Sequence, residues 1–99
     1  MRIYISGKMT GLPKEEYRAK FKTASARLVE QGHTAVNPAM LDEFGLTYAE
    51  YMAVDTTLLS FCDAIYMLDN WRNSGGAHLE WDYANTLGLV IMYEEEEQR

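Results

Sequence analysis

Two carboxylates in this sequence occupy positions where a helix would carry apolar side chains. Glu80 lies on one helical stripe with Ala77, Ala84 and Leu87, and the pair Gly75-Gly76 precedes it. If the positive end of that helix keeps Glu80 ionised in a partly dry pocket, the carboxylate can act as a nucleophile or a base. If Glu80 only binds the free N–H groups of its own helix, it is a capping partner with a structural role. Both interpretations are open at this point.

Asp55 is the second acid on an apolar helical stripe. The residues that share this stripe are Tyr48, Met52, Leu59 and Cys62. Asp55 would instead be a helix N-cap if its helix began later than Thr47, which the run Asp-Thr-Thr allows. Tyr4 lies in a short apolar run that predicts a strand. A tyrosine at such a position is typical of an ordinary core aromatic, so Tyr4 by itself does not indicate a functional site.

Two loops are rich in glycine and small polar residues: S-G-K-M-T-G at 6–11 and D-N-W-R-N-S-G-G at 69–76. Their candidate ligand-binding residues are Gly7, Lys8, Thr10, Ser74, Gly75 and Gly76. Ser74 precedes two glycines at a helix start, which suits an anion, although many such serines are only caps. The first loop does not match a nucleoside triphosphatase phosphate loop, because its lysine comes too early. The run H-L-E at 78–80 lacks the P-C-x-x-C of a zinc deaminase. We therefore expect no metal and no cofactor.

The elements that must position these residues alternate between strand and helix. Apolar runs predict strands at residues 2–6, 33–37, 64–68 and 89–93. Helical spacing predicts helices at 14–31, at 47–62 and around Glu80, where Gly88 ends the last one. This order predicts an α/β fold, a flavodoxin-like doubly wound sheet of about four parallel strands, order 2-1-3-4, with helices on both faces. Such sheets bind ligands beyond the C-terminal ends of strands one and three, where both glycine-rich loops fall.

Composition predicts one small domain, residues 1–93, followed by an acidic tail. The chain has 99 residues, 47% of them hydrophobic, and one cysteine, Cys62, which we expect to be a small buried side chain. Residues 94–99, E-E-E-E-Q-R, carry −3 of the formal net charge of −6, and we expect them to be disordered. The acidic balance argues against a nucleic-acid polymer as partner. No apolar run suits a membrane span or a signal peptide, so we expect a cytoplasmic protein.

Four motifs together resemble a known family. They are I-Y-I-S-G-K-M-T-G-L-P, V-N-P, Y-M-x-x-D-x-x-x-L-x-x-C-D and W-x-x-S-x-G-A-x-x-E. The chain resembles a small family of bacteria and their phages that is similar to the nucleoside 2-deoxyribosyltransferases. Relatives of that family include hydrolases that cut the N-glycosidic bond of nucleoside 5′-monophosphates. The resemblance extends to about Tyr93.

The resemblance implies a role for each matching position. The nucleophilic glutamate of the S-x-G-x-x-x-E motif falls on Glu80, and the family's acid before the third strand falls on Asp55. Its tyrosine in strand one matches Tyr4, and the glycine that follows matches Gly7. The transferases carry an aspartate six residues before the nucleophile, whereas this chain has Ser74, as the monophosphate hydrolases do. This substitution implies a phosphorylated substrate.

The implied function is N-glycosidic bond cleavage or deoxyribosyl transfer on a nucleoside or nucleoside 5′-monophosphate. Ionised Glu80 would attack the anomeric carbon, while Asp55 and Tyr4 would orient the sugar or help to protonate the departing base. Ser74 and helix N–H groups would hold a 5′-phosphate. The alternative is a binding module that keeps the crevice for a nucleotide without turnover, for example a phage protein that sequesters a nucleotide signal.

We also expect a homodimer or a larger oligomer. A chain of this length leaves one side of a shallow crevice open, and the proteins that it resembles complete theirs with a neighbouring subunit. Surface aromatics such as Tyr48, Tyr51 or Trp81 would seal the contact.

Overall fold

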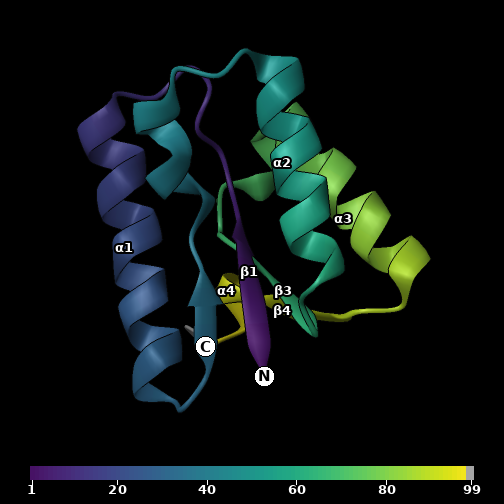
Figure 1. Cartoon of the computed structure of the whole chain (residues 1–99). Coiled ribbons are helices and arrows are strands. Elements are labelled where there is room, and N and C mark those ends of the chain that lie inside the picture. Colours follow the sequence, from purple (N-terminus) through teal and green to yellow (C-terminus); the bar gives the residue numbers. More distant parts are fainter. Residues whose placement is uncertain (98–99) are drawn as a thin grey trace.

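The computed structural model describes residues 1–97 as a parallel β-sheet covered by helices (Figure 1). The strands are β1 (Arg2–Ser6), β2 (Thr34–Val36), β3 (Ala64–Met67) and β4 (Val90–Tyr93). They lie in the order β2-β1-β3-β4, and each neighbouring pair is parallel. The predicted fold class and strand order are confirmed. Because β1 and β3 are central neighbours, the loops that follow them meet at one edge of the sheet.

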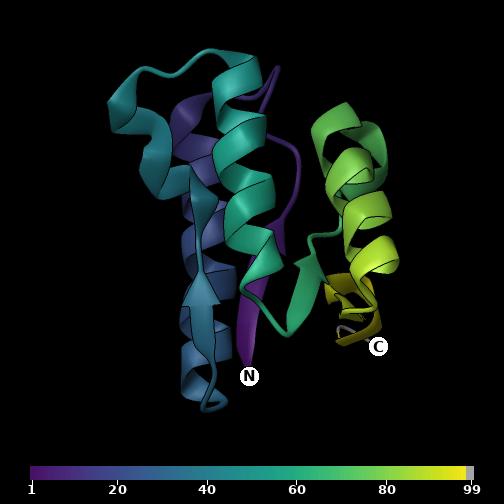
Figure 2. The ribbon, with the colours of Figure 1, turned by 45° about the vertical axis from the view of Figure 1, so that its right-hand side comes forward.

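Helices cover both faces of this sheet. α1 (Lys14–Glu30) packs on one face, and α2 (Tyr48–Ser60) and α3 (Gly75–Leu87) run side by side on the other (Figure 2). The 3-10 helix η1 (Pro38–Phe44) follows β2, and η2 (Trp71–Asn73) follows β3. Within residues 1–97, none of the helices has the length and apolar character needed to cross a membrane.

Alternate residues of β1 face opposite layers of the fold. Ile3 and Ile5 belong to the core beneath α1, whereas Tyr4 belongs to the core beneath α2 and α3. Side chains alternate along a strand with a period of two, so Ser6 points to the same face as Tyr4. Two polar side chains of β1 therefore lie under α3. Cys62 is buried in the same core, as expected.

Local capping sets where α2 and α3 begin. Thr47 and Glu50 form a capping box at the start of α2, in which Thr47 Oγ1 accepts from the Glu50 N–H at 3.2 Å. Asp55 is therefore in the middle of α2, and the interpretation of Asp55 as an N-cap is wrong. Ser74 caps α3, because its Oγ accepts from the Ala77 N–H at 3.1 Å.

The prediction that residues 94–99 are disordered is wrong for Glu94–Glu97, which form the short helix α4. Glu94 is 5% exposed and lies 3.7 Å from both Lys20 Nζ and Arg27 Nη1. These two cations compensate the negative charge of Glu94. The sequence of the tail alone does not reveal this compensation, because both cations belong to α1. Residues 98 and 99, which were part of the same expectation, lie outside the described residues.

Gly7 allows the loop after β1 to pass against the residue that follows β3. The Leu68 N–H donates to Ser6 O at 2.8 Å, so the segments that follow β1 and β3 stay paired up to this point. A Cβ on Gly7 would lie 2.7 Å from Leu68 Cδ1 and 2.9 Å from Leu68 Cβ. Carbon atoms do not approach so closely without strain. The close approach of the two loops therefore requires glycine here.

Gly7→Ala should lower the free energy of unfolding by about 1 to 3 kcal/mol, because Leu68 is buried and has little room to move away. Urea unfolding measures this loss. Gly75→Ala is the matched control, since a Cβ on Gly75 would meet nothing within 4 Å. Alanine also favours a helix over glycine by up to about 1 kcal/mol, so the control should be at least as stable as the wild type. Equal stability of Gly7→Ala and the wild type would contradict the close packing.

Candidate functional site

Glu80 is buried where α3 crosses over β1. The Tyr4 hydroxyl donates to Glu80 Oε2, and Ser6 Oγ donates to Glu80 Oε1 at 2.7 Å. The side chain is 5% exposed, so these two hydroxyls take the place of water around the carboxylate. Glu80 thus bonds to the sheet, while Ser74 caps the start of its helix. These hydrogen bonds do not support the interpretation of Glu80 as a capping partner.

Asp55 brings a second buried carboxyl group close to Tyr4, from α2. It is 8% exposed, and among the described residues its Oδ1 has no hydrogen-bond partner. Burial raises the pKa of Asp55 to about 6, and the Tyr4 hydroxyl opposes that rise. A buried oxygen without a partner costs stability.

Burial raises the pKa values of the ionisable groups of this site. Burial, and then the charge of Asp55, raise the pKa of Glu80 to about 7, against the opposing hydrogen bonds from Tyr4 and Ser6. Burial, and then the charges of Glu80 and Asp55, raise the pKa of Tyr4 well above its ordinary value of 10.0, so its hydroxyl keeps its proton. Glu80 therefore exchanges a proton near pH 7, which suits a nucleophile or a general base.

These three side chains line a cavity of about 660 Å³. Its other walls come from the loops after β1 and β3, the N-terminal half of α1, the first turns of α2 and α3, and η1. All nine candidate residues of the sequence line it: Tyr4, Gly7, Lys8, Thr10, Asp55, Ser74, Gly75, Gly76 and Glu80. A cavity of this volume is in the usual range for small-molecule sites. Within residues 1–97, no group of three or more His, Cys, Asp or Glu side chains is placed to hold a metal ion.

The start of α3 presents backbone N–H groups to this cavity. The first helical hydrogen bond runs from the His78 N–H to Ser74 O at 3.1 Å, and the Ala77 N–H is bound by Ser74 Oγ. The N–H groups of Gly75 and Gly76 come earlier and have no intrahelical acceptor. Open space surrounds Gly75, since a Cβ there would meet no atom within 4 Å. Such a helix start attracts anions.

The loop after β1 forms another part of the wall. Lys8 is partly buried, and its backbone N–H donates to Asn70 Oδ1 at 3.1 Å. Thr10 is exposed at the tip of the loop. Both residues line the same cavity.

Three residues of the site were not predicted from the sequence: Ser6, Asp42 and Lys14, the last of which lines the cavity from α1. Ser6 was not a candidate, although the period-two pattern of a strand places it on the same face as Tyr4 and would have found it. Asp42 in η1 lines the cavity and accepts from the Tyr17 hydroxyl at 2.7 Å and from Arg18 Nε at 2.8 Å. No local pattern links η1 to α1, so only the tertiary structure reveals this contact.

Two of the three aromatics expected at the surface are partly buried. Trp81 stacks on Trp71 with ring centroids 5.7 Å apart and donates to the Tyr93 hydroxyl at 3.0 Å. Tyr51 and Tyr48 both line the cavity, and Tyr48 is 58% exposed. The expected oligomer stays a prediction, and Tyr48 is the most exposed of these three aromatics.

The family model described as "Domain of unknown function (DUF4406)" matches residues 1–93. The chain belongs to the DUF4406 family. Two solved structures share its fold: a CMP N-glycosidase from Clostridium botulinum, at 18% identity and a TM-score of 0.67, and a 2-desoxiribosyltransferase from Leishmania mexicana, at 21% and 0.74. They match 94% and 93% of this chain, which spans 67% and 62% of theirs. No curated protein matches the chain.

These comparisons confirm the resemblance inferred from the sequence, at the level of family and fold. At such low identity the two structures establish a common fold alone. The chemistry of this DUF4406 domain depends on its own residues, because one fold can support different functions.

The raised pKa of Glu80 makes the stability of this DUF4406 domain depend on pH. The folded state holds the proton of Glu80 more tightly than the unfolded state, whose pKa is 4.5. The resulting stability is full below that value and is lost as the pH rises through about 7. Glu80→Gln has no such proton. Its free energy of unfolding should therefore rise relative to the wild type between about pH 5 and about pH 8, on the order of 2 kcal/mol.

Urea unfolding at the two pH values measures this difference. Glu30→Gln makes the same chemical change at an exposed position of α1, outside the cavity, and should show the pH dependence of the wild type. If Glu80→Gln also followed the wild type at both pH values, Glu80 would not be the group with the raised pKa.

Proposed function

We propose that this chain breaks the N-glycosidic bond of a nucleoside or a nucleoside 5′-monophosphate, with Glu80 as its nucleophile. The observation that carries the proposal is the buried Glu80 carboxylate, which two hydroxyls hold at the wall of a cavity of about 660 Å³. The fold that the chain shares with a CMP N-glycosidase and a 2-desoxiribosyltransferase supports a reaction of the same class.

In the first step, the ionised Glu80 carboxylate attacks the anomeric carbon from the face opposite the base. The C–O bond of a glycosyl ester forms while the C–N bond breaks, and the base leaves with the electron pair of that bond. Tyr4 and Ser6 fix the carboxylate in one orientation, which lowers the entropy cost of the attack. Water then attacks the ester and releases the sugar, or a second base takes the sugar in a transfer reaction.

The two neighbours of Glu80 have separate roles in this proposal. The Tyr4 hydroxyl is already bound to Glu80 and keeps its proton, so Tyr4 positions the nucleophile. Asp55 has an oxygen without a partner among the described residues, and its pKa is about 6. It can accept a hydrogen bond from a sugar hydroxyl when ionised, or give its proton to the departing base when protonated.

A 5′-phosphate would bind at the start of α3. The N–H groups of Gly75 and Gly76 and the positive end of the helix dipole favour an anion there. Lys8 and Lys14 also line the cavity and add two positive charges to its wall. An overall negative charge of −6 does not prevent such binding, because these groups act locally.

The first test of this function is the release of free base. We expect chromatography to detect free base after the wild type is incubated with a panel of nucleosides and their 5′-monophosphates. Glu80→Gln should reduce turnover about 10³-fold or more, because groups of this kind each contribute about 10² to 10⁴. Its ligand binding should largely persist, since the contacts proposed for the phosphate do not involve the carboxylate. Glu30→Gln should act like the wild type.

Wild-type activity that survives in Glu80→Gln would refute the role of nucleophile. If the wild type binds a member of the panel and leaves it intact, the chain is a nucleotide-binding module instead. Isothermal titration calorimetry of the same panel separates these outcomes.

The pH dependence of kcat/KM tests the ionisation that the attack requires. Only the ionised fraction of Glu80 can react, so kcat/KM should rise with pH and level off above about 7 if Asp55 acts as a hydrogen-bond acceptor. If Asp55, whose pKa is about 6, must instead give its proton to the base, kcat/KM should fall toward pH 8. The informative interval is from about pH 6.5 to about pH 8, because a substrate phosphate has its own second pKa near 6. A nucleoside substrate without phosphate serves as the control. A kcat/KM that stays constant across this interval would contradict an attack by Glu80.

A further inference from the structure

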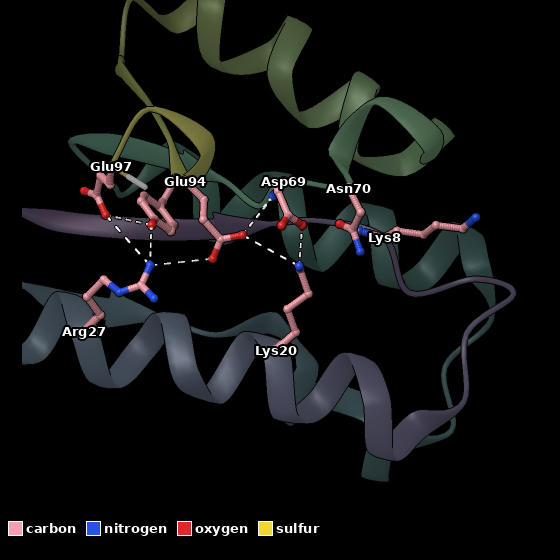
Figure 3. Close-up of polar contacts among 8 residues, drawn as sticks. Lys8, Lys20, Arg27, Asp69, Asn70, Glu94 and Glu97 are labelled. Carbon is pink, nitrogen blue, oxygen red and sulfur yellow. Dashed lines mark hydrogen bonds and ion pairs between the residues drawn. The ribbon is translucent and has the colours of Figure 1, made fainter. Parts of the chain in front are cut away.

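One hydrogen bond outside the cavity joins the two loops that form its wall. The Lys8 N–H donates to Asn70 Oδ1 at 3.1 Å, and the two residues lie next to each other (Figure 3). Lys8 and its neighbours in the loop after β1 line the cavity, whereas Asn70 is not among the lining residues. Any effect of Asn70 on a ligand would therefore act through this loop.

The backbone on the other side of Asn70 is held by a buried carboxylate. Glu94 Oε1 accepts from the Asp69 N–H at 3.0 Å (Figure 3). Glu94 lies close to Lys20 and Arg27 of α1, and Lys20 also pairs with the carboxylate of Asp69. The residue before Asn70 is thus tied to both α1 and α4.

Tyr66 completes the attachment of α4. Its hydroxyl accepts from Arg27 Nη1 at 3.1 Å and donates to Glu97 Oε2 at 2.8 Å. These contacts hold α4 against β3 and α1. Because Glu94 of α4 accepts a hydrogen bond from the Asp69 N–H, they also fix the backbone next to Asn70.

We propose that Asn70 is a positioning residue, which holds residues 7–11 in the conformation that lines the cavity. The expected effect on turnover rests on the proposed function, whereas the hold on the loop does not. The Lys8 N–H is a donor, so the Asn70 atom that faces it is the carbonyl oxygen, and an aspartate could accept the same bond. Without this bond the loop, whose tip at Thr10 is exposed, opens more readily.

Hydrogen exchange measured by NMR tests the hold on the loop and needs no substrate. In Asn70→Ala the Lys8 amide should exchange about tenfold faster, the factor that corresponds to one lost hydrogen bond. Asn70→Asp should restore the protection. The Leu68 amide, which donates to Ser6 O at 2.8 Å, should not change.

Two outcomes of this measurement would overturn the proposal. One is an unchanged Lys8 amide in Asn70→Ala, and the other is an equal acceleration at Leu68, which would indicate a general loss of stability. Asn85→Ala is the matched control, because Asn85 bonds to Trp81 O on the exposed side of α3, away from both loops. It should leave the Lys8 amide as in the wild type.

Steady-state kinetics then test the consequence for the ligand. A loosened loop weakens binding of the ground state and the transition state alike. In Asn70→Ala, KM should rise about 5- to 10-fold while kcat stays within about twofold, and Asn70→Asp should restore KM. An unchanged KM in Asn70→Ala, with a wild type that releases base, overturns the positioning role and leaves the proposed function intact. If the wild type releases no base from the panel, the proposed function fails, and the exchange measurement alone decides the role of Asn70.

Discussion

A carboxylate that is 5% exposed loses nearly all of its hydration, and the loss costs several kcal/mol unless hydrogen bonds replace the water. Glu80 meets this requirement through Tyr4 and Ser6, which are 76 and 74 residues away in the sequence. Both donors belong to the same face of β1, so the arrangement requires α3 to pack across that face. The parallel sheet and the connection from β3 to α3 place α3 over this face of β1. Glu80 is thereby buried beside the two hydroxyls that replace its water.

The compensation is incomplete, and that shapes the chemistry of the site. Burial and the charge of Asp55 still raise the pKa of Glu80 to about 7, although two hydrogen bonds oppose the rise. Asp55 keeps a buried oxygen that has no partner among the described residues. Buried polar groups without a partner and shifted pKa values are both found more often at functional sites.

Charge compensation on the opposite face follows the same rule. The Glu94 carboxylate is as buried as that of Glu80, and Lys20, Arg27 and the Asp69 N–H surround it. The acidic segment is therefore ordered over Glu94–Glu97, where its side chains meet the cations of α1 and the hydroxyl of Tyr66. The charge of a segment predicts disorder only when no complementary surface lies within reach.

Local patterns determined much of this protein. Apolar runs and helical spacing predicted the order of the elements, the parallel sheet and the two loops that follow its central strands. Glu80 and Asp55 are recognisable as candidates because each is an acid on an apolar helical stripe. Family motifs added Tyr4, and all three side chains line one cavity. Such features are visible in the sequence because they repeat over a few neighbouring residues.

Only the tertiary structure decided which of these residues touch. It placed the Tyr4 and Ser6 hydroxyls on the carboxylate of Glu80, and it left Asp55 Oδ1 without a partner among the described residues. It also joined Asp42 to α1 and ordered Glu94 beside Lys20. The physical reason is that pKa values and buried hydrogen bonds depend on distances of a few ångströms between segments far apart in the chain. No periodicity within a single segment encodes those distances.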